Sequence, residues 1–552
     1  MWPARGGHAG VTLRACAAAC GLALLLLALA GGIESARGLW QDESTLLANF
    51  GLPLADYFGP LPYYDQAAPP LAMMTLSAAY GLAGGSIMAT RLLLLALNLA
   101  LFAGIAVAAV RRGDRQVLLA IAIIAVTPLA VRYCVELKQY GFETQASLLF
   151  LVALRWLPHR AGLVMALAAV LSFFSYSIML VVGVAVLDAI VFRFRGPLAG
   201  RWMALLVAYT VGWLACYVLL FQPATALQTA NYPDAYERLP LADYVHNPQL
   251  LLLRFRPIVW AQAVIAGFCG LLAMKVILVA RRSRIPPTTW RLQAMAGDAW
   301  QPLRLMAELL GLVMLLWMAK LYPVSAERQF LFLMPIGALV VAHGLLAATE
   351  VIRSAFVIVT ALAFTLLPSA GVTLLREWNR NAIIQDTAGL YAFLKRNPDA
   401  LVLPDLLFEP TLRAYVARDP KPPRVAVWLL GESRPMPTPR EALADLSRGD
   451  VPIRQHLWYA LYSGDLYPAY VEWVIGQAHR APTSIFAAVQ FDPRYALAVF
   501  RAARRRGCDA HEAYRSRDVI AYRITCPRQT RFRQPSSASS TTTGSAQMTR
   551  VL

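Results

Sequence analysis

Long apolar runs, separated by short polar and basic stretches, recur along the first 375 residues of the chain. An α-helix needs about 20 apolar residues to cross the hydrocarbon core of a bilayer, and we identify about eleven runs near that length. The pattern therefore predicts a polytopic α-helical membrane protein. The runs lie near residues 15–33, 90–110, 115–131, 143–157, 161–175, 178–193, 202–221, 258–280, 303–320, 329–348 and 354–373.

Arginine-rich loops predict the orientation of these spans. Basic residues gather at 111–115, 155–160, 193–201 and 281–291, which fall on one side of the membrane if the spans alternate. Lys and Arg in short loops mark the cytoplasmic side. We therefore expect a cytoplasmic N-terminus and, because the number of spans is odd, an extracytoplasmic C-terminal region.

The polar parts of the chain divide into three segments. Residues 34–89 form a long first loop on the outer side, in which LAMMTLSAAYGL is a candidate interfacial helix. Residues 376–530 mix possible strands and helices, and about 150 residues suffice for one small α+β domain. Residues 531–552 are rich in Ser and Thr, which is typical of a disordered tail. We expect a transmembrane module over residues 1–375, followed by this periplasmic domain and the tail.

Composition supports a membrane protein and argues against a nucleic-acid partner. Of the 552 residues, 58% are hydrophobic and 15% are charged, whereas a soluble protein would carry about 25% charge. The net charge is +19, but much of the arginine lies in loops between apolar runs. Arginine in such loops indicates the orientation of the spans and not a surface for nucleic acid. The expected partner is therefore a lipid bilayer.

Two of the seven cysteines, Cys508 and Cys526, lie in the C-terminal polar region. Disulfides form and persist in oxidising compartments outside the cytoplasm. If this region is extracytoplasmic, we expect the two cysteines to be paired.

Four polar clusters fall on the predicted outer face. Each cluster lies at the end of a predicted loop. An acidic side chain there costs little free energy if it is solvated and much if it is buried. Acids and cations that recur on one face, beside aromatic residues, indicate a pocket at the bilayer surface; the alternative for each cluster is a solvated loop end. The clusters are Asp42-Glu43, Asp65-Gln66, Glu136 with Lys138, and Glu327-Arg328, and the aromatic residues are Trp40, Tyr63, Tyr64, Tyr140 and Tyr322.

Such a pocket suits group transfer from a phosphate-bearing lipid. A carboxylate can deprotonate an incoming hydroxyl, while Lys or Arg stabilises the departing phosphate. The sequence has no nucleotide-binding G-x-x-x-x-G-K-[ST], no G-x-S-x-G and no H-E-x-x-H motif. Outside the cytoplasm the energy source cannot be ATP, and an activated lipid-linked substrate meets that constraint.

The order of these motifs resembles the GT-C class of membrane glycosyltransferases. The sequence has D-E in the first outer loop, then D-Q-A-A-P-P, then E-L-K-Q-Y, and then Y-P-V-S-A-E-R before F-L-F-L-M-P. It is most similar to the bacterial group of protein O-mannosyltransferases and lipid A aminoarabinose transferases. The resemblance covers most of residues 10–375 by layout. It implies a GT-C fold, a polyprenyl-phosphate sugar donor at the outer face of the bacterial inner membrane, and inversion at the anomeric carbon.

The resemblance also implies roles for individual residues. Asp42 matches the catalytic base that activates the acceptor hydroxyl, with Glu43 as a second catalytic or positioning carboxylate. Lys138 and Arg328 match positions suited to binding the donor phosphate. Glu136 would orient Lys138 or bind a divalent cation.

Other candidates complete the expected pocket. Tyr140 and Tyr322 would line it, as would Asp65 and Gln66, although D-Q-A-A-P-P also suits a turn before an interfacial helix. His246 is a second candidate for a metal ligand. No cofactor is required by the pattern, and a divalent cation remains an option.

Two other classes of function stay open. A lipid-linked sugar transporter or flippase would carry charged residues at mid-membrane and internal repeats. A non-catalytic envelope assembly protein would work through its soluble domain and tolerate Asp42→Asn. The sequence does not identify the sugar, nor whether the acceptor is an envelope glycan, a lipid or a protein.

Overall fold

The computed structural model describes most of the N-terminal two thirds of the chain and parts of the remainder. The predicted spans 258–280 and 354–373 and the predicted tail lie outside the described residues. The described residues are 8–63, 67–223, 226, 246, 301–323, 327–352, 386–398, 400–405, 408–416, 418–425, 475, 485–490, 493–516 and 519–527.

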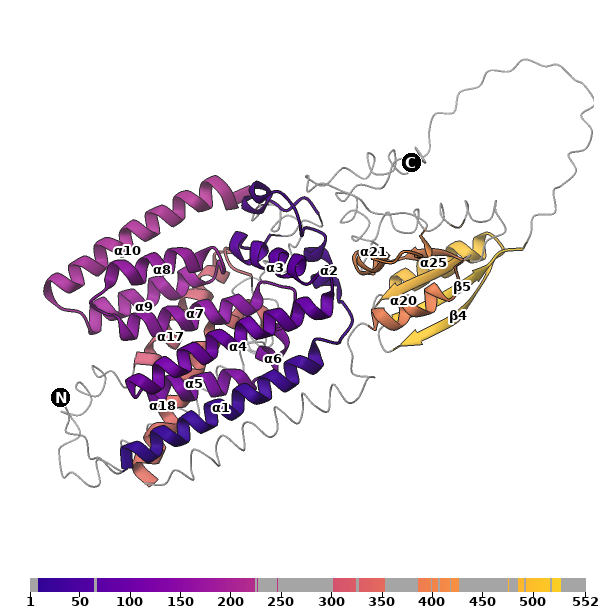
Figure 1. The fold of residues 1–552 in the computed structure, drawn as a ribbon. Coiled ribbons are helices and arrows are strands. Elements are labelled where there is room, and N and C mark those ends of the chain that lie inside the picture. The colour runs from indigo at the N-terminus through magenta and orange to yellow at the C-terminus, as the bar shows by residue number, and fades with distance from the viewer. Residues whose placement is uncertain are drawn as a thin grey trace, which may run out of the picture.

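A bundle of apolar helices forms the first part of the structure (Figure 1). Among the described residues, five helical segments are long and apolar enough to cross a membrane: Leu13–Glu34, Ile87–Arg112, Gly196–Phe221, Gln301–Met318 and Gln329–Leu346. Nine of the expected spans coincide with described helices, whereas the total of eleven stays a prediction. These helices are α1 (His8–Glu34), α4 (Ile87–Arg112), α5 (Arg115–Val126), α7 (Tyr140–Trp156), α8 (Ala161–Ser172), α9 (Ile178–Phe192), α10 (Gly196–Cys216), α17 (Gln301–Met318) and α18 (Met334–Ile352).

Helix α5 lies at the centre of the bundle and is shorter than the predicted span 115–131. Every residue from Gln116 to Val126 is buried, and α1, α4 and α18 pack around it. The helix ends because Pro128 disfavours helical backbone at Thr127, which is extended with ψ of 135°. Pro128 then begins α6 (Pro128–Tyr133), which leads to the E-L-K-Q-Y stretch. The prediction of one continuous span was therefore wrong at its C-terminal end.

Three short elements fill the first polar loop. They are α2 (Gln41–Leu47), the 3₁₀-helix η1 (Leu54–Phe58) and α3 (Pro70–Leu82), which contains the stretch predicted as an interfacial helix. Leu46, Met73 and Leu76 are wholly buried in a small core that this loop shares with Leu94 of α4. The loop is thus packed against the bundle.

Hydrogen bonds also join this loop to the turn between α8 and α9. The amide of Leu71 donates to the carbonyl of Phe173 at 2.9 Å, and the hydroxyl of Tyr176 donates to the carbonyl of Ala68 at 3.1 Å. The turn therefore separates the two predicted spans 161–175 and 178–193.

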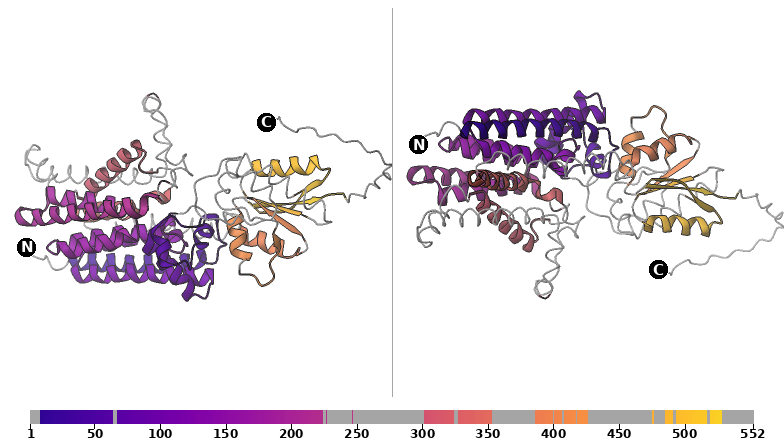
Figure 2. Two further views of the ribbon diagram at one scale, coloured as in Figure 1. Left: turned by 90° about the horizontal axis from the view of Figure 1, so that it is seen from above. Right: turned by 90° about the horizontal axis from the view of Figure 1, so that it is seen from below.

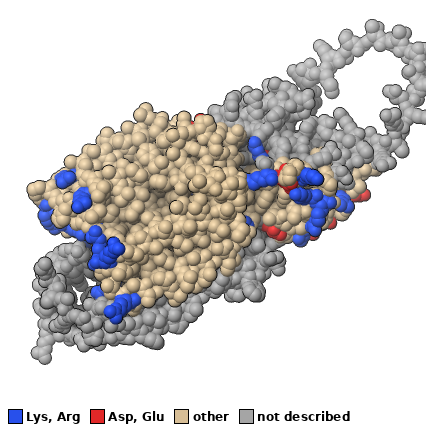
Figure 3. Space-filling model, viewed as in Figure 1, with Lys and Arg blue, Asp and Glu red and all other residues tan. Residues whose placement is uncertain are grey.

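One end of the bundle is basic. At the basic end, Arg155 pairs with Asp114, and Trp202 donates to the carbonyl of Pro158. Figure 3 shows blue Lys and Arg at the end of the bundle away from the sheet and a middle surface almost free of charge. The three arginine-rich loops within the described residues therefore share one end, as the orientation pattern requires.

A five-stranded mixed sheet forms the second part of the structure. Its order is β2-β1-β3-β5-β4, with β1 parallel to β2 and β3, and β5 antiparallel to β3 and β4. The strands are β1 (Leu401–Pro404), β2 (Arg424–Val425), β3 (Ile485–Gln490), β4 (Asp509–Ser516) and β5 (Val519–Thr525).

Among the described residues, helices cover both faces of this sheet (Figure 2). Helices α20 (Thr387–Lys395) and α21 (Glu409–Val416) lie on one face, where Leu390 and Leu412 pack against Phe486 and Ala521. Helix α25 (Pro493–Arg505) lies on the other face. Side chains alternate between the two faces along a strand, so both faces of the sheet carry apolar side chains.

A disulfide joins Cys508 and Cys526, which lie next to the start of β4 and the end of β5. The bond therefore closes the hairpin formed by these strands at its open end.

Candidate functional site

The acidic pair of the first loop opens α2. Trp40 precedes this helix in an extended conformation, and its amide donates to Glu43 Oε2 at 3.4 Å. Acidic side chains in a first helical turn are favoured because the amides there lack intrahelical partners. Consecutive helical positions point in different directions, so Glu43 is buried while Asp42 is only half-buried.

Glu43 is wholly buried in a network of cationic and amide donors. Arg91 Nη2 lies 2.6 Å from Glu43 Oε2, and Arg37 Nη2 lies 3.3 Å from Oε1. The amide of Leu137 donates to Oε1 at 3.0 Å. Burial raises the pKa of Glu43, but the two guanidinium groups and this amide outweigh it and hold the pKa below its usual value. Glu43 is therefore a carboxylate with both oxygens engaged.

Arg91 connects this network to the end of α1. It lies near the start of α4, has no exposed surface, and donates to the carbonyls of Ser35 at 3.3 Å, Arg37 at 2.5 Å and Gly38 at 3.2 Å. A buried charge is costly unless it is paired and hydrogen-bonded. The contacts of Arg91 meet both conditions and hold the segment that leads from α1 into α2.

A second acid, Glu136, faces the same segment from the stretch after α6. Glu136 Oε1 accepts a hydrogen bond of 2.8 Å from Trp40 Nε1, and Oε2 lies 3.4 Å from Arg132 Nε. The guanidinium of Arg132 also lies over the Trp40 ring, 4.8 Å from its centroid. Trp40 is therefore held by an acid at its edge and a cation on its face.

The pKa of Glu136 is raised to about 7. Burial is the main cause; Arg37 and Arg132 oppose it, whereas the negative charges of Glu43 and Asp42 add to it. The negative charge of Asp42 therefore acts on the pKa of Glu136. Acids with perturbed pKa values cluster at functional sites, although structural networks perturb them as well.

The sheet together with α20, α21 and α25 is called the sheet region. It contacts the segment around α2 directly. Thr387 Oγ1 donates to the carbonyl of Leu39 at 2.6 Å, and the amide of Leu39 donates to the hydroxyl of Tyr415 at 3.1 Å. Ser44 Oγ donates to Thr411 Oγ1 at 3.0 Å. The acidic pair therefore lies between the bundle on one side and α20 and α21 on the other (Figure 1).

The structure brings together only some of the predicted site residues. Asp42, Glu43 and Glu136 form one group, and Lys138 is buried two residues beyond Glu136. Tyr140 begins α7, with its ring 5.4 Å from that of Tyr133.

Tyr322 contacts a different part of the bundle. Its hydroxyl donates to the carbonyl of Gln329 at 2.6 Å and lies 3.5 Å from Ser177 Oγ. Arg328 belongs to the 3₁₀-helix η5 (Glu327–Leu333), but its side chain lies outside the described part. Asp65 and Gln66 lie outside the described residues.

The metal prediction gains no support within the described ranges. They contain no group of three or more His, Cys, Asp or Glu residues that could hold a metal ion. Glu136 is engaged with Trp40 and Arg132, and His246 is exposed. Glu136 instead orients Trp40, a contact that spacing along the chain does not reveal.

Sequence reasoning missed the three arginines that organise the site. Arg91 follows Ile87-Met88-Ala89-Thr90 and precedes an unbroken apolar run, so its charge at the start of a span was the available signal. Arg37 and Arg132 carried no comparable signal, because an arginine near a span end is ordinarily solvated.

Comparisons with known proteins give one structural likeness. No family model matches the chain, and no curated protein matches it. Among solved structures, the chain is similar to the crystal structure of ArnT from Cupriavidus metallidurans in the apo state, with 14% identity, a TM-score of 0.44, and coverage of 92% of this chain and 98% of that chain. ArnT is a lipid A aminoarabinose transferase of the GT-C class, the group that the order of motifs resembles. At this identity and TM-score the likeness carries no argument about this chain.

Proposed function

We propose that this protein is a membrane glycosyltransferase of the GT-C class, which moves a sugar from a polyprenyl-phosphate donor to a hydroxyl acceptor with inversion. The observation that carries the proposal is the half-buried Asp42 beside the buried Glu43, at the end of an apolar bundle opposite the arginine-rich loops. The ionic network around Glu43 fixes the start of α2, so Asp42 is presented on a rigid element.

In the proposed reaction Asp42 acts as the general base. Its carboxylate accepts the proton of the acceptor hydroxyl while that oxygen bonds to the anomeric carbon. The bond between this carbon and the phosphate oxygen breaks, and its electron pair leaves with the lipid phosphate. Attack from the face opposite the phosphate inverts the configuration.

Glu43 has a positioning role in this proposal. Both of its oxygens accept from donors of the protein, and its pKa is held low, so it is a poor proton acceptor. Its charge is balanced by Arg91 and Arg37. Asp42 is therefore the better candidate for the base.

Two cationic residues are assigned to hold the departing phosphate. Lys138 is assigned this role together with Arg328, whose charge would stabilise the phosphate as it leaves. Tyr140 and Tyr322 would line the donor pocket. The phosphate is a good leaving group once it is neutralised, so no acid is needed to protonate it.

The sheet region is proposed to position the acceptor. Its helices α20 and α21 contact α2 through Leu39 and Ser44, on the side of the acidic pair away from the bundle. The basic end of the bundle would face the cytoplasm. The acidic pair and the sheet would then lie on the outer side of a bacterial inner membrane, where lipid-linked donors supply activated sugar.

The proposal is tested by mass spectrometry of polyprenyl-phosphate lipids in cells lacking the gene. The deletion is complemented with wild type, Asp42→Asn or Glu512→Gln, the last being an exposed acid of β4 that serves as control. We expect a polyprenyl-phosphate sugar to accumulate in the deletion and in the Asp42→Asn strain, and to disappear with wild type and Glu512→Gln. Absence of accumulation, or clearance by Asp42→Asn, would contradict the proposal and favour a transport or assembly role.

A further inference from the structure

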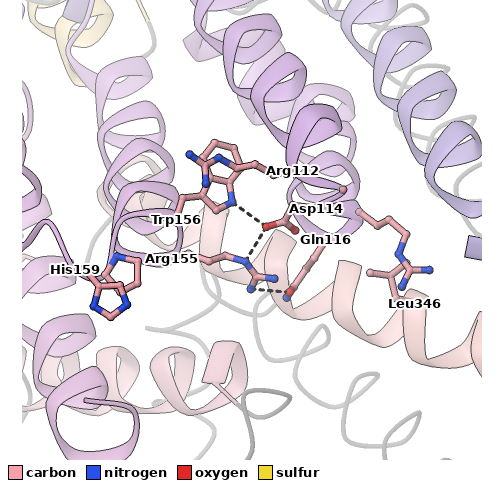
Figure 4. Close-up of a pocket in the computed structure, with 10 residues that line it drawn as sticks. Arg112, Asp114, Gln116, Arg155, Trp156, His159 and Leu346 are labelled. Atoms are coloured by element: carbon pink, nitrogen blue, oxygen red, sulfur yellow. Dashed lines mark hydrogen bonds and ion pairs between the residues drawn. The ribbon is translucent and has the colours of Figure 1, made fainter. Parts of the chain in front are cut away.

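A cavity of about 580 Å³ opens at the basic end of the bundle, the opposite end from the acidic pair (Figure 4). It is formed by the end of α4, the start of α5, the end of α7 with the following loop, and Leu346 of α18. Its volume is within the range of small-ligand sites. The proposed transfer reaction does not use it.

A hydrogen-bonded frame fixes one wall of the cavity. Asp114 Oδ2 accepts from Arg155 Nε at 2.8 Å and from Trp156 Nε1 at 3.0 Å. Arg155 Nη1 donates to Gln116 Oε1 at 3.0 Å, and Gln116 Nε2 donates to the carbonyl of Leu339 at 3.1 Å. The frame links α5, α7 and α18, so the wall is preorganised.

Positive charge exceeds negative charge on the cavity wall. The residues that line it include three arginines, Arg112, Arg115 and Arg155, but a single carboxylate, Asp114, which pairs with Arg155. Arg112 lies over the Trp156 ring, 5.0 Å from its centroid, and is exposed. The wall therefore contributes Arg112 and Arg115 in addition to the Arg155–Asp114 pair, and its net charge is positive.

We propose that this cavity binds the phosphate of an anionic phospholipid from the adjacent leaflet. Guanidinium groups bind phosphate oxygens in a planar, bidentate manner, and basic pockets between spans are suited to anionic head groups. Trp156 is a residue type favoured at the head-group level of a bilayer.

The position of the cavity favours a lipid over a soluble anion. It lies where α4 ends after 26 residues of apolar helix. On the same helix Val107 and Val110 are exposed, and they offer apolar surface to acyl chains. By the distribution of arginine the leaflet is the cytoplasmic one. A bound lipid would bridge α4, α5 and α7 at their basic ends.

The test is lipid retention by the full-length protein in native mass spectrometry. Protein in mixed micelles is titrated with dioleoylphosphatidylglycerol or dioleoylphosphatidylcholine, and separately with glycerol 3-phosphate. The variant is Arg112→Gln with Arg115→Gln. The matched control is Arg195→Gln with Arg201→Gln, which removes the same charge at the same membrane end outside the cavity.

We expect wild type and control to bind one phosphatidylglycerol at least 10-fold more tightly than phosphatidylcholine, and the cavity variant to lose most of this preference. Equal loss in the control, or equal affinity for the two lipids, would overturn the proposal. Saturation by glycerol 3-phosphate at the concentration that suffices for the lipid would also overturn it, because the site would then bind a soluble anion. The single variant Arg115→Gln, expected to give an intermediate loss, provides the same comparison should the double variant fold poorly.

Discussion

Arg91 Nη2 lies 2.6 Å from Glu43 Oε2, and neither side chain has any exposed surface. The two residues are 48 positions apart along the chain, and their pair joins the start of α4 to the first turn of α2. It therefore connects a membrane-length helix to the loop that carries Asp42. The position of Asp42 depends on this connection, although Asp42 is not part of it.

Replacing Arg91 with Met should destabilise the protein strongly. Removal of one partner of a buried pair leaves an uncompensated buried charge and typically costs about 3–5 kcal/mol. Thermal unfolding in detergent should show a clear fall in Tm, whereas Arg111→Met, at an exposed position of the same helix, should leave Tm nearly unchanged. Equal stability of the two variants would show that the buried pair does not hold the site together.

Replacing Asp42 and Glu43 one at a time should separate the effect on catalysis from the effect on stability. Asp42→Asn is expected to lower kcat by about 100-fold or more through loss of the general base, with little change in Tm. Glu43→Gln is expected to lower Tm, because Arg91 and Arg37 lose their counter-charge. Both are measured as sugar transfer and thermal unfolding of the same preparations. A fall in kcat for Glu43→Gln alone, at unchanged Tm, would reverse the two roles.

Stability should depend on pH through Glu136. Its folded-state pKa is raised from 4.5 to about 7, chiefly by burial, so the folded protein binds the proton more tightly than the unfolded chain. The stabilisation is fully present below about pH 4.5 and is lost as the pH rises through about 7. Tm of wild type should fall between pH 5 and pH 8 by more than Tm of Glu136→Gln. An identical fall in both proteins would assign the dependence to other groups.

Much of the bundle could be predicted from the sequence because its signal is local. An apolar run of sufficient length specifies a helix wherever it lies, and described helices occupy nine of the expected spans. The break at Thr127 was missed because Pro128 sits inside an apolar run, where length argued for a single span. The acidic pair and Glu136 were identified by their recurrence on one face.

The contacts that organise the site could not be predicted in the same way. The Trp40–Glu136 hydrogen bond spans 96 residues and the Leu39–Tyr415 hydrogen bond spans 376 residues, so no periodicity connects their partners. Trp40 was named only as one of the aromatic residues beside the polar clusters, and its indole nitrogen gave no indication of an acidic partner. Such pairs follow from helix packing, which depends on the whole chain.

The contact between the sheet region and α2 should be weakened by removing single hydroxyl groups. Tyr415→Phe leaves the amide of Leu39 without its acceptor, and Thr387→Val removes the donor to the carbonyl of Leu39. Each is expected to cost about 1 kcal/mol. Amide hydrogen exchange over residues 38–47 should become faster in both. Tyr391→Phe is the control, because its hydroxyl bonds to Asp419 within the sheet region; equally fast exchange in the control would show that α2 is not held by these contacts.

Removing the disulfide should destabilise the sheet region without unfolding the bundle. Cys508 and Cys526 enclose a hairpin and are 18 residues apart, and a cross-link over that length restricts the unfolded chain by about 3 kcal/mol. Cys508→Ser with Cys526→Ser should therefore make residues 509–525 more sensitive to proteolysis. The control is Cys216→Ser in α10, a free cysteine remote in sequence from the sheet, which should leave that sensitivity unchanged. Helical circular dichroism should persist in both proteins, because the bundle contacts the sheet region through the polar loop around α2 and does not depend on the hairpin for its own packing. Loss of the helical signal together with the hairpin would show that the two parts unfold as one cooperative unit.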